Sequence, residues 1–183
     1  SFEGPISQTH GRSGPLRVSP LRIVHPMALA FLEACGEVGL RRIEDYCAGD
    51  IDGAYLNLTT QTRGQRCSTA RGYLEPVSHR PNLRVITGAL VDRVVFEDGR
   101  AAVVHYRQSG EDKEIRARGG VILSGGAMQT PAMLMRSGIG PGQHLQDQGI
   151  EVIRDRPEVG RNLREHPGIM VSRLVDVPTY NVM

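Results

Sequence analysis

One stretch of the sequence, Val121 to Gly140, combines residue types that could bind an anionic ligand. It begins with the apolar run Val121 to Leu123, which is typical of a strand buried on both faces of a parallel sheet. The run Ser124-Gly125-Gly126 then permits a tight turn, and glycine lets backbone N–H groups come close to a ligand. These residues predict a buried strand that ends in a glycine-rich turn.

A helix is expected to follow this turn. Thr130 and Pro131 form a typical helix start, with a hydroxyl N-cap and proline at the first helical position, and Gly138 is the expected end. A helix N-terminus behind a glycine turn favours a negatively charged group such as a phosphate. The predicted ligand-binding residues are Ser124, Gly125, Gly126, Ala127 and Thr130. The alternative is a buried strand–helix unit that binds nothing.

The other residues that could do chemistry are scattered along the chain. Cys35, Cys47 and Cys67 form no CxxC pair and the six histidines are dispersed, so no metal site is expected. An odd number of cysteines argues against a disulfide framework and favours a reducing cytoplasm. No G-x-G-x-x-G follows a strand, so the phosphate pocket of a Rossmann fold is missing. No catalytic residue is assigned in this chain.

Upstream of the glycine-rich turn, the apolar pattern changes to that of strands. Residues 83–87 and 89–96 are expected to be strands, and Asp98-Gly99 is a strong signal for a hairpin that returns through 101–106. A second turn leads into 114–118, so these residues predict an antiparallel meander that precedes the buried strand. Further strands are expected at Ile150 to Ile153 and Ile169 to Val175.

A helix is also expected near the start of the chain, beginning at Pro26 and ending at Gly39. Its apolar residues recur at helical spacing and are interpreted as core: Met27, Phe31, Ala34, Cys35 and Val38. A second, short helix is expected from Pro141 through Gln146.

The charge composition of the chain bears on which partners it can attract. The 183 residues include 22 basic and 20 acidic side chains, a net charge of +2, which predicts no strong attraction to nucleic acid or to a membrane surface. No apolar run reaches the length of a membrane span.

Four segments, in this order and spacing, resemble the glucose–methanol–choline (GMC) oxidoreductases, flavoenzymes that oxidise alcohols with FAD. The segments are RGQRCSTARGYLEP (63–76), RPNLRVITGALVDRVVF (80–96), SGGAMQTPAMLMRSGIGP (124–141) and RPEVGRNLREHP (156–167). The resemblance is strong from Gly64 to Pro167 and weaker before about Gly53.

The resemblance implies an α+β fold, FAD as the cofactor and a small alcohol as the substrate. Residues 1–82 would belong to a substrate-binding domain, residues 83–167 to an FAD-binding domain, and residues 168–183 would return to the substrate-binding domain. In the family the dinucleotide motif lies upstream and the catalytic histidine lies beyond Met183. The chain is therefore expected to be an internal fragment that neither turns over substrate nor retains FAD by itself.

The resemblance also implies two further cofactor-binding residues. The backbone of Val91 is expected to hydrogen-bond the adenine of FAD, and Asn162 is expected near the cofactor. Glu165 stands where the family usually has aspartate, so no contact is assigned to that carboxylate. Two other readings stay open: a non-redox module that binds a nucleotide or phosphate, and a non-catalytic interaction domain.

Overall fold

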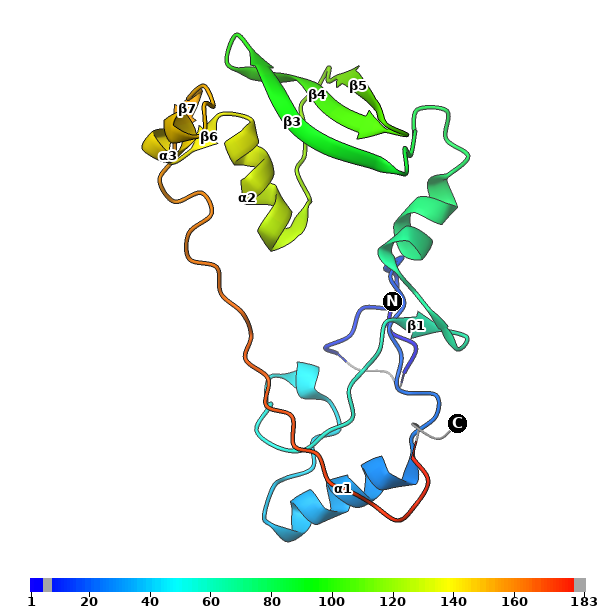
Figure 1. Ribbon diagram of the computed structural model, residues 1–183. Helices are drawn as coiled ribbons and strands as arrows, with labels where there is room; N and C mark the ends of the chain where they lie inside the picture. Colours follow the sequence, from blue (N-terminus) through cyan, green and yellow to red (C-terminus); the bar gives the residue numbers. More distant parts are fainter. Residues whose placement is uncertain (5–7, 180–183) are drawn as a thin grey trace. The chain divides into compact units, whose positions relative to one another are not determined.

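The computed structural model describes residues 1–4 and 8–179, and the chain divides into two compact units (Figure 1). One unit contains residues 1–84 together with the segment from residue 172 onward, and the other contains residues 85–171. Helices and small sheets occur in both, so the mixed α+β class predicted from the sequence is confirmed. Within the described residues, none of the helices combines the length and the apolarity needed to cross a bilayer.

The second unit is built on the predicted antiparallel meander. Strand β3 (Ala89–Glu97) pairs with β4 (Arg100–Gln108), which pairs with β5 (Glu111–Arg116). The turns at Asp98-Gly99 and Ser109-Gly110 have positive φ at both residues, 49° and 75° in the first and 54° and 84° in the second. Positive φ at both central positions defines the two-residue turn whose twist suits a hairpin, and Asp-Gly is one of its preferred sequences.

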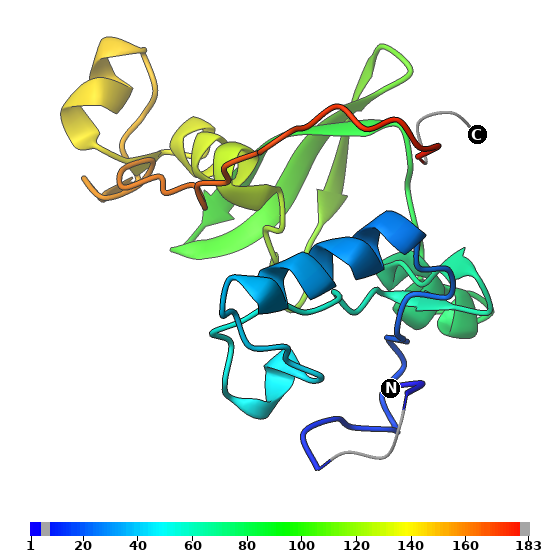
Figure 2. The same cartoon turned by 90° about the horizontal axis from the view of Figure 1, so that it is seen from below.

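Helix α2 (Gly126–Arg136) lies alongside β3 in the same unit (Figure 2). Met133 is the buried side chain of this helix, and its C-cap is Ser137. Gly138 follows with φ +82°, the left-handed conformation that ends a helix, so the predicted end is confirmed. Its Cβ position would lie 2.6 Å from the Glu151 carbonyl oxygen, so the site also excludes any side chain.

Three short elements follow α2 in the second unit. Strand β6 (Ile139–Gly140) pairs in parallel with β7 (Arg154–Asp155), and helix α3 (Gly142–Asp147) lies between them in sequence. Leu145 of α3 is fully buried. The short helix predicted after Pro141 is thus confirmed, whereas the strand expected at 150–153 is wrong, because the pairing residues lie just after it.

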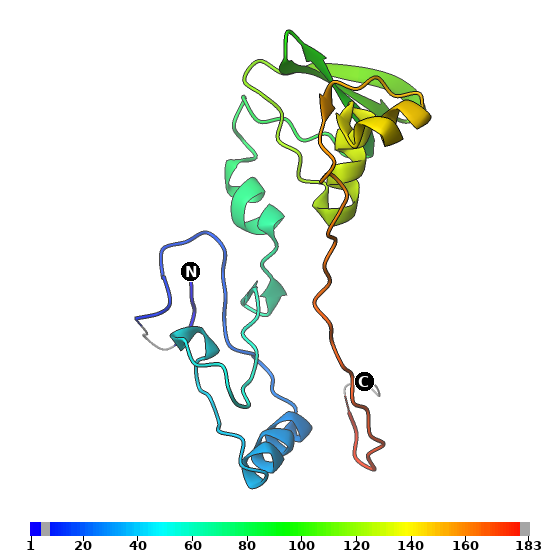
Figure 3. The ribbon, with the colours of Figure 1, turned by 90° about the vertical axis from the view of Figure 1, so that its left-hand side faces the viewer.

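The strand predicted at Val121 to Leu123 is not formed. These residues are assigned to no helix or strand, and the Ile122 side chain is 91% exposed. A strand buried on both faces needs a neighbouring strand and two covering layers, and the described residues supply no strand that pairs with it. The strands expected at 83–87 and 169–175 are also absent. Residues 161–171 run as an extended segment with exposed apolar side chains (Figure 3).

The first unit contains helix α1 (Pro26–Glu37), whose bounds agree with the prediction. His25 caps it because its ring Nδ1 accepts a hydrogen bond from the Met27 N–H at 3.1 Å. The apolar stripe was expected to be core, and this is wrong for most of its members. Cys35 is buried, but Phe31 and Val38 are 69% and 78% exposed. The face that is buried within this unit is instead marked by Leu32 and Cys35.

The remainder of this unit consists of turns, isolated bridges and a small hairpin. The 3₁₀ helix η1 (Tyr46–Ala48) is capped by Asp45, and strands β1 (Gln61–Thr62) and β2 (Gln65–Arg66) form the hairpin. A π-helical turn, η2 (Ala70–Leu74), continues into the 3₁₀ helix η3 (Glu75–Val77). Bridges join residue 2 to 18, 19 to 59 and 42 to 54.

Candidate functional site

A β-bulge in β3 shapes the region around Val91. The pairing with β4 passes from Val91 and Tyr106 directly to Arg93 and His105, so Asp92 is an extra residue with no partner on β4. A bulge of this kind leaves the extra residue outside the ladder and re-aims the backbone. On its outer edge, β3 therefore has backbone N–H and C=O groups whose hydrogen-bond partners must come from another element.

The C-terminal end of α2 supplies those partners. The Arg136 Nε donates a hydrogen bond of 2.7 Å to the Asp92 carbonyl oxygen. The Ser137 hydroxyl oxygen accepts a hydrogen bond of 2.9 Å from the Val94 N–H and donates one of 2.6 Å to the Met133 carbonyl oxygen. Ser137 is only 6% exposed, so water does not compete for these bonds. The position of α2 against Val91 and its neighbours is thereby fixed.

At its other end, α2 opens to solvent through two glycines. Gly125 is the N-cap, and no side chain caps this helix end. The four residues from Ser124 to Ala127 are all exposed. The first turn of a helix carries N–H groups without intrahelical partners and a partial positive charge. An exposed helix start without a side-chain cap can therefore offer those groups to an anion.

The two glycines are required for different reasons. A Cβ at Gly125 would lie 3.0 Å from the Met133 Cε and 3.1 Å from the Gln129 Cβ, so a side chain there would fit only if these neighbours shifted. A Cβ at Gly126 would meet nothing within 4 Å, but this residue has φ +80°. Gly126 is needed for its backbone conformation, which L side chains rarely adopt.

The predicted N-cap role of Thr130 is wrong. The helix begins four residues earlier, at Gly126, and Pro131 lies inside it. Thr130 is therefore an interior helical residue, half-buried, and not the N-cap. The left-handed Gly126 turns the chain into the helix before the Thr-Pro pair is reached. Pro131 has no N–H, so the Ala127 carbonyl, in the first turn, has no intrahelical partner at that position.

A cavity of about 510 Å³ is lined by Val91 and other residues of β3 and β4 and, from α2, by Gln129 and Arg136. Val91, Tyr106 and Gln129 contribute to its wall. The charged side chains at its rim are paired: Arg93 and Arg136 with Asp92, Arg107 with Asp112, and Lys113 with Glu111. The hydrogen bond that the Arg107 Nε donates lowers the pKa of the Asp112 carboxyl below its usual range.

Asn162 is not brought to this cavity. It lies after β7 with an exposed side chain and φ +56°, a left-handed conformation that asparagine tolerates better than most residues. The structure therefore brings Val91 and Gln129 to one cavity, places Ser124 to Ala127 at the exposed start of α2, and leaves Asn162 apart from the cavity.

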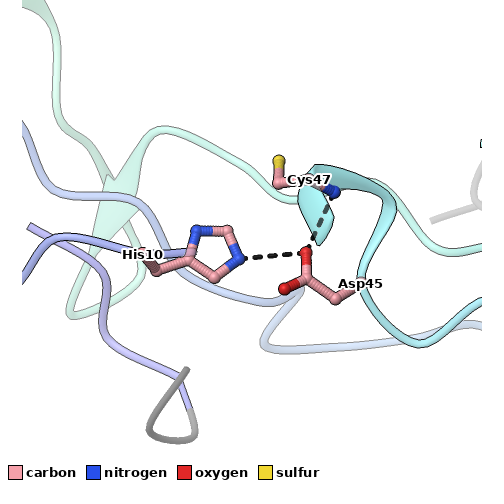
Figure 4. Close-up of side chains that lie close together, drawn as sticks. All are labelled: His10, Asp45 and Cys47. Carbon is pink, nitrogen blue, oxygen red and sulfur yellow. Dashed lines mark hydrogen bonds and ion pairs between the residues drawn. The ribbon is translucent and has the colours of Figure 1, made fainter. Parts of the chain in front are cut away.

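The first unit holds two features that the sequence did not reveal. An apolar cavity of about 470 Å³ is lined in part by Tyr46 and Tyr55, whose rings stack with centroids 4.6 Å apart. Beside it, His10, Asp45 and Cys47 place one potential metal-ligating atom each within 4.8 Å of one another (Figure 4). His10 is 35 residues from Asp45, so no local spacing motif could have indicated the cluster.

Known proteins share this arrangement of segments. The chain is 42% identical over 156 residues to the oxygen-dependent choline dehydrogenase of Rhizobium johnstonii, a match that covers 85% of the chain and 28% of that protein. It is 40% identical over 162 residues to an alcohol dehydrogenase (acceptor) of Pseudomonas putida, covering 87% of the chain and 29% of that protein.

Among solved structures, an FAD-dependent oxidoreductase from Chaetomium thermophilum matches with a TM-score of 0.75 at 31% identity. This match covers 80% of the chain and 26% of the solved protein. The chain thus spans less than a third of the length of these relatives. The family model described as GMC oxidoreductase matches residues 6–168, which include the bulge of β3, the glycine turn and α2. The sequence resemblance is confirmed, and the chain belongs to the GMC oxidoreductase family.

Proposed function

We propose that the chain is a segment of an FAD-dependent enzyme that oxidises the CH–OH group of a small alcohol. The observation that carries the proposal is the exposed N-terminus of α2, opened by Gly125 and Gly126, on a helix whose opposite end is held on β3 by the Arg136 and Ser137 hydrogen bonds. This arrangement occurs within the residues that match the family. The chain's share of the work is to bind and orient the cofactor.

The residues present fit the flavin nucleotide. An anion is favoured at the first turn of α2, where Gly125 and Gly126 remove side chains that would stand between a ligand and the backbone N–H groups. Ser124 and Ala127 flank this turn, while Thr130 lies one helical turn further in. Val91 would contribute backbone groups from β3 to the adenine, and Asn162 a side chain from the segment after β7. When bound, the flavin accepts a hydride from the alcohol carbon.

The two units suggest how the domains of the enzyme are divided. Residues 1–82 and 168–183 would belong to the substrate-binding domain, and residues 83–167 to the FAD-binding domain. The compact units, 1–84 with the segment from 172 onward and 85–171, support this division. The catalytic base would lie in chain outside the present sequence. The three cysteines are all free, which supports a cytoplasmic location.

The substrate would be an alcohol of the kind that the relatives' names give: choline for one and an alcohol without further definition for another. The test is to purify the longer enzyme that contains this chain and to mix it anaerobically with choline or with benzyl alcohol. We expect a yellow protein with about one FAD per chain, whose flavin absorbance bleaches with at least one alcohol. A protein that binds nucleotide phosphates but no flavin would favour the non-redox module, and a colourless protein that binds neither would favour the interaction domain.

A further inference from the structure

The cluster of His10, Asp45 and Cys47 has no role in the proposed alcohol oxidation. It lies in the first unit, where Asp45 and Cys47 stand at the start of η1 and His10 comes from the loop that precedes residue 18 (Figure 4). An imidazole, a carboxylate and a thiol are ligand types that zinc combines in proteins. His10 comes from a distant part of the chain to join two such groups at one turn, and this juxtaposition therefore needs an explanation.

The surroundings hold two of the three groups in place. The Asp45 Oδ1 accepts hydrogen bonds from the Cys47 N–H and from the His10 Nε2, both at 3.0 Å, and the Asp45 Oδ2 accepts one of 2.9 Å from the Thr9 hydroxyl. The His10 ring also stacks on Phe2 with centroids 4.1 Å apart. Ligands that are fixed in this way lose little conformational entropy when an ion binds.

Burial differs across the cluster in a way that suits ion entry. The side chains of His10 and Asp45 are 12% and 26% exposed, whereas Cys47 is exposed. The sheltered imidazole and carboxylate would form the floor of a site, and the thiol would approach from the solvent side. An ion could therefore enter without any rearrangement of the fold.

We propose that His10, Asp45 and Cys47 bind a divalent ion of the zinc class, with a fourth position left to water. Zinc bonds of about 2.0–2.3 Å in a tetrahedron require ligand atoms about 3.3–3.7 Å apart. The three atoms already lie within 4.8 Å of one another, and rotation of the exposed Cys47 side chain can supply the contraction. Binding releases the Cys47 thiol proton to solvent. The His10 ring stays neutral and takes the tautomer with its proton on Nδ1, so that Nε2 offers its lone pair to the ion.

Such an ion would act as a structural clasp. It would join the N-terminal loop to η1 across 35 residues of sequence, and bonds from the ion to both side chains would replace the hydrogen bond between His10 and Asp45. An ion that binds only the folded state stabilises that state in proportion to its occupancy. This role is independent of the flavin, so it can fail or hold whatever the outcome for the proposed function.

The test uses the full chain, freed of metal by dialysis against a chelator and then equilibrated with zinc. We expect about one zinc ion per chain after gel filtration, measured by mass spectrometry of the metal, and a higher melting temperature. Cobalt in place of zinc should produce a thiolate-to-cobalt charge-transfer band. The exposed Cys47→Ser variant should keep the fold, lose this band and bind zinc at least roughly 10- to 100-fold more weakly, since even the loss of an outer-shell partner costs that much.

His105→Gln is the matched control. Its ring also faces a carboxylate, that of Glu114 at 3.7 Å, and no third group of the described residues completes a metal-capable cluster there. This variant should bind zinc as tightly as the wild type, whereas His10→Gln should not. The proposal is overturned if the wild-type chain gives no cobalt–thiolate band, or if Cys47→Ser binds zinc as tightly as wild type. The His10–Asp45 pair is then only the cap of η1.

Discussion

The docking of α2 on β3 can be tested by removing one hydroxyl. In Ser137→Ala the Val94 N–H loses its hydrogen-bond acceptor, and the Met133 carbonyl oxygen loses a donor. Val94 is 4% exposed, so water does not replace the missing partner. A buried donor left unsatisfied costs about 1–3 kcal/mol. We expect the free energy of unfolding to fall by that amount and the Val94 amide to exchange with solvent roughly 5- to 150-fold faster.

Urea denaturation and amide hydrogen exchange measure these two quantities directly. The control is Ser78→Ala, which removes an exposed hydroxyl that donates to the Glu75 carbonyl oxygen at 2.8 Å. That variant should stay within about 0.5 kcal/mol of the wild type. If Ser137→Ala unfolds at the same urea concentration as the wild type and the exchange of Val94 is unchanged, Ser137 does not hold the helix on the strand.

Three further outcomes are expected. Because Thr130 is an interior helical residue and not a cap, Thr130→Ala should be neutral or should stabilise the chain by a few tenths of a kcal/mol, which thermal denaturation can measure; a loss of about 1 kcal/mol would restore the capping role. The Asp112 pKa is lowered by its hydrogen bond from Arg107, so that bond stabilises the chain above the ordinary aspartate pKa and is lost as the pH falls through the folded-state value. Asp112→Asn should therefore be slightly less stable than the wild type at pH 7 and equally stable in strong acid, which pH-dependent denaturation can measure. An equal loss of stability at both pH values would show that the ion pair is not its cause. The 183-residue chain purified alone should be colourless, and a visible flavin spectrum near one FAD per chain would contradict the expectation that this fragment does not retain FAD by itself.

Local turn chemistry was predictable from the sequence. Asp98-Gly99 needs positive φ at two successive residues, and the structure has it there, so the hairpin and its two strands follow from residues that are neighbours in the chain. The ends of α1 and α2 were predictable for the same reason, since Gly39 and Gly138 supply the left-handed residue that stops a helix.

Features that depend on distant partners were not predictable. The strand expected at Val121 to Leu123 needs neighbouring strands that the described chain lacks. The bulge at Asp92 has no local sequence signal, because the hydrogen bond that its carbonyl oxygen accepts comes from Arg136, 44 residues away. The start of α2 was placed wrongly because Thr-Pro is a stronger local signal than a left-handed glycine. His10 and Cys47 are far apart in the sequence and come together only in the folded chain, so their spacing in the sequence could not predict the cluster.

Flavin retention by two glycine variants of the longer enzyme tests the central claim most directly. Gly126→Val and Gly110→Val each place a β-branched residue at positive φ, +80° and +84°, and neither Cβ would meet an atom within 4 Å. Both should suffer similar backbone strain of about 1–3 kcal/mol. If the start of α2 holds the cofactor, Gly126→Val should bind FAD roughly tenfold or more weakly while Gly110→Val, in the β4–β5 turn, keeps its flavin. Equal FAD content in the two variants would contradict a cofactor role for the glycine turn.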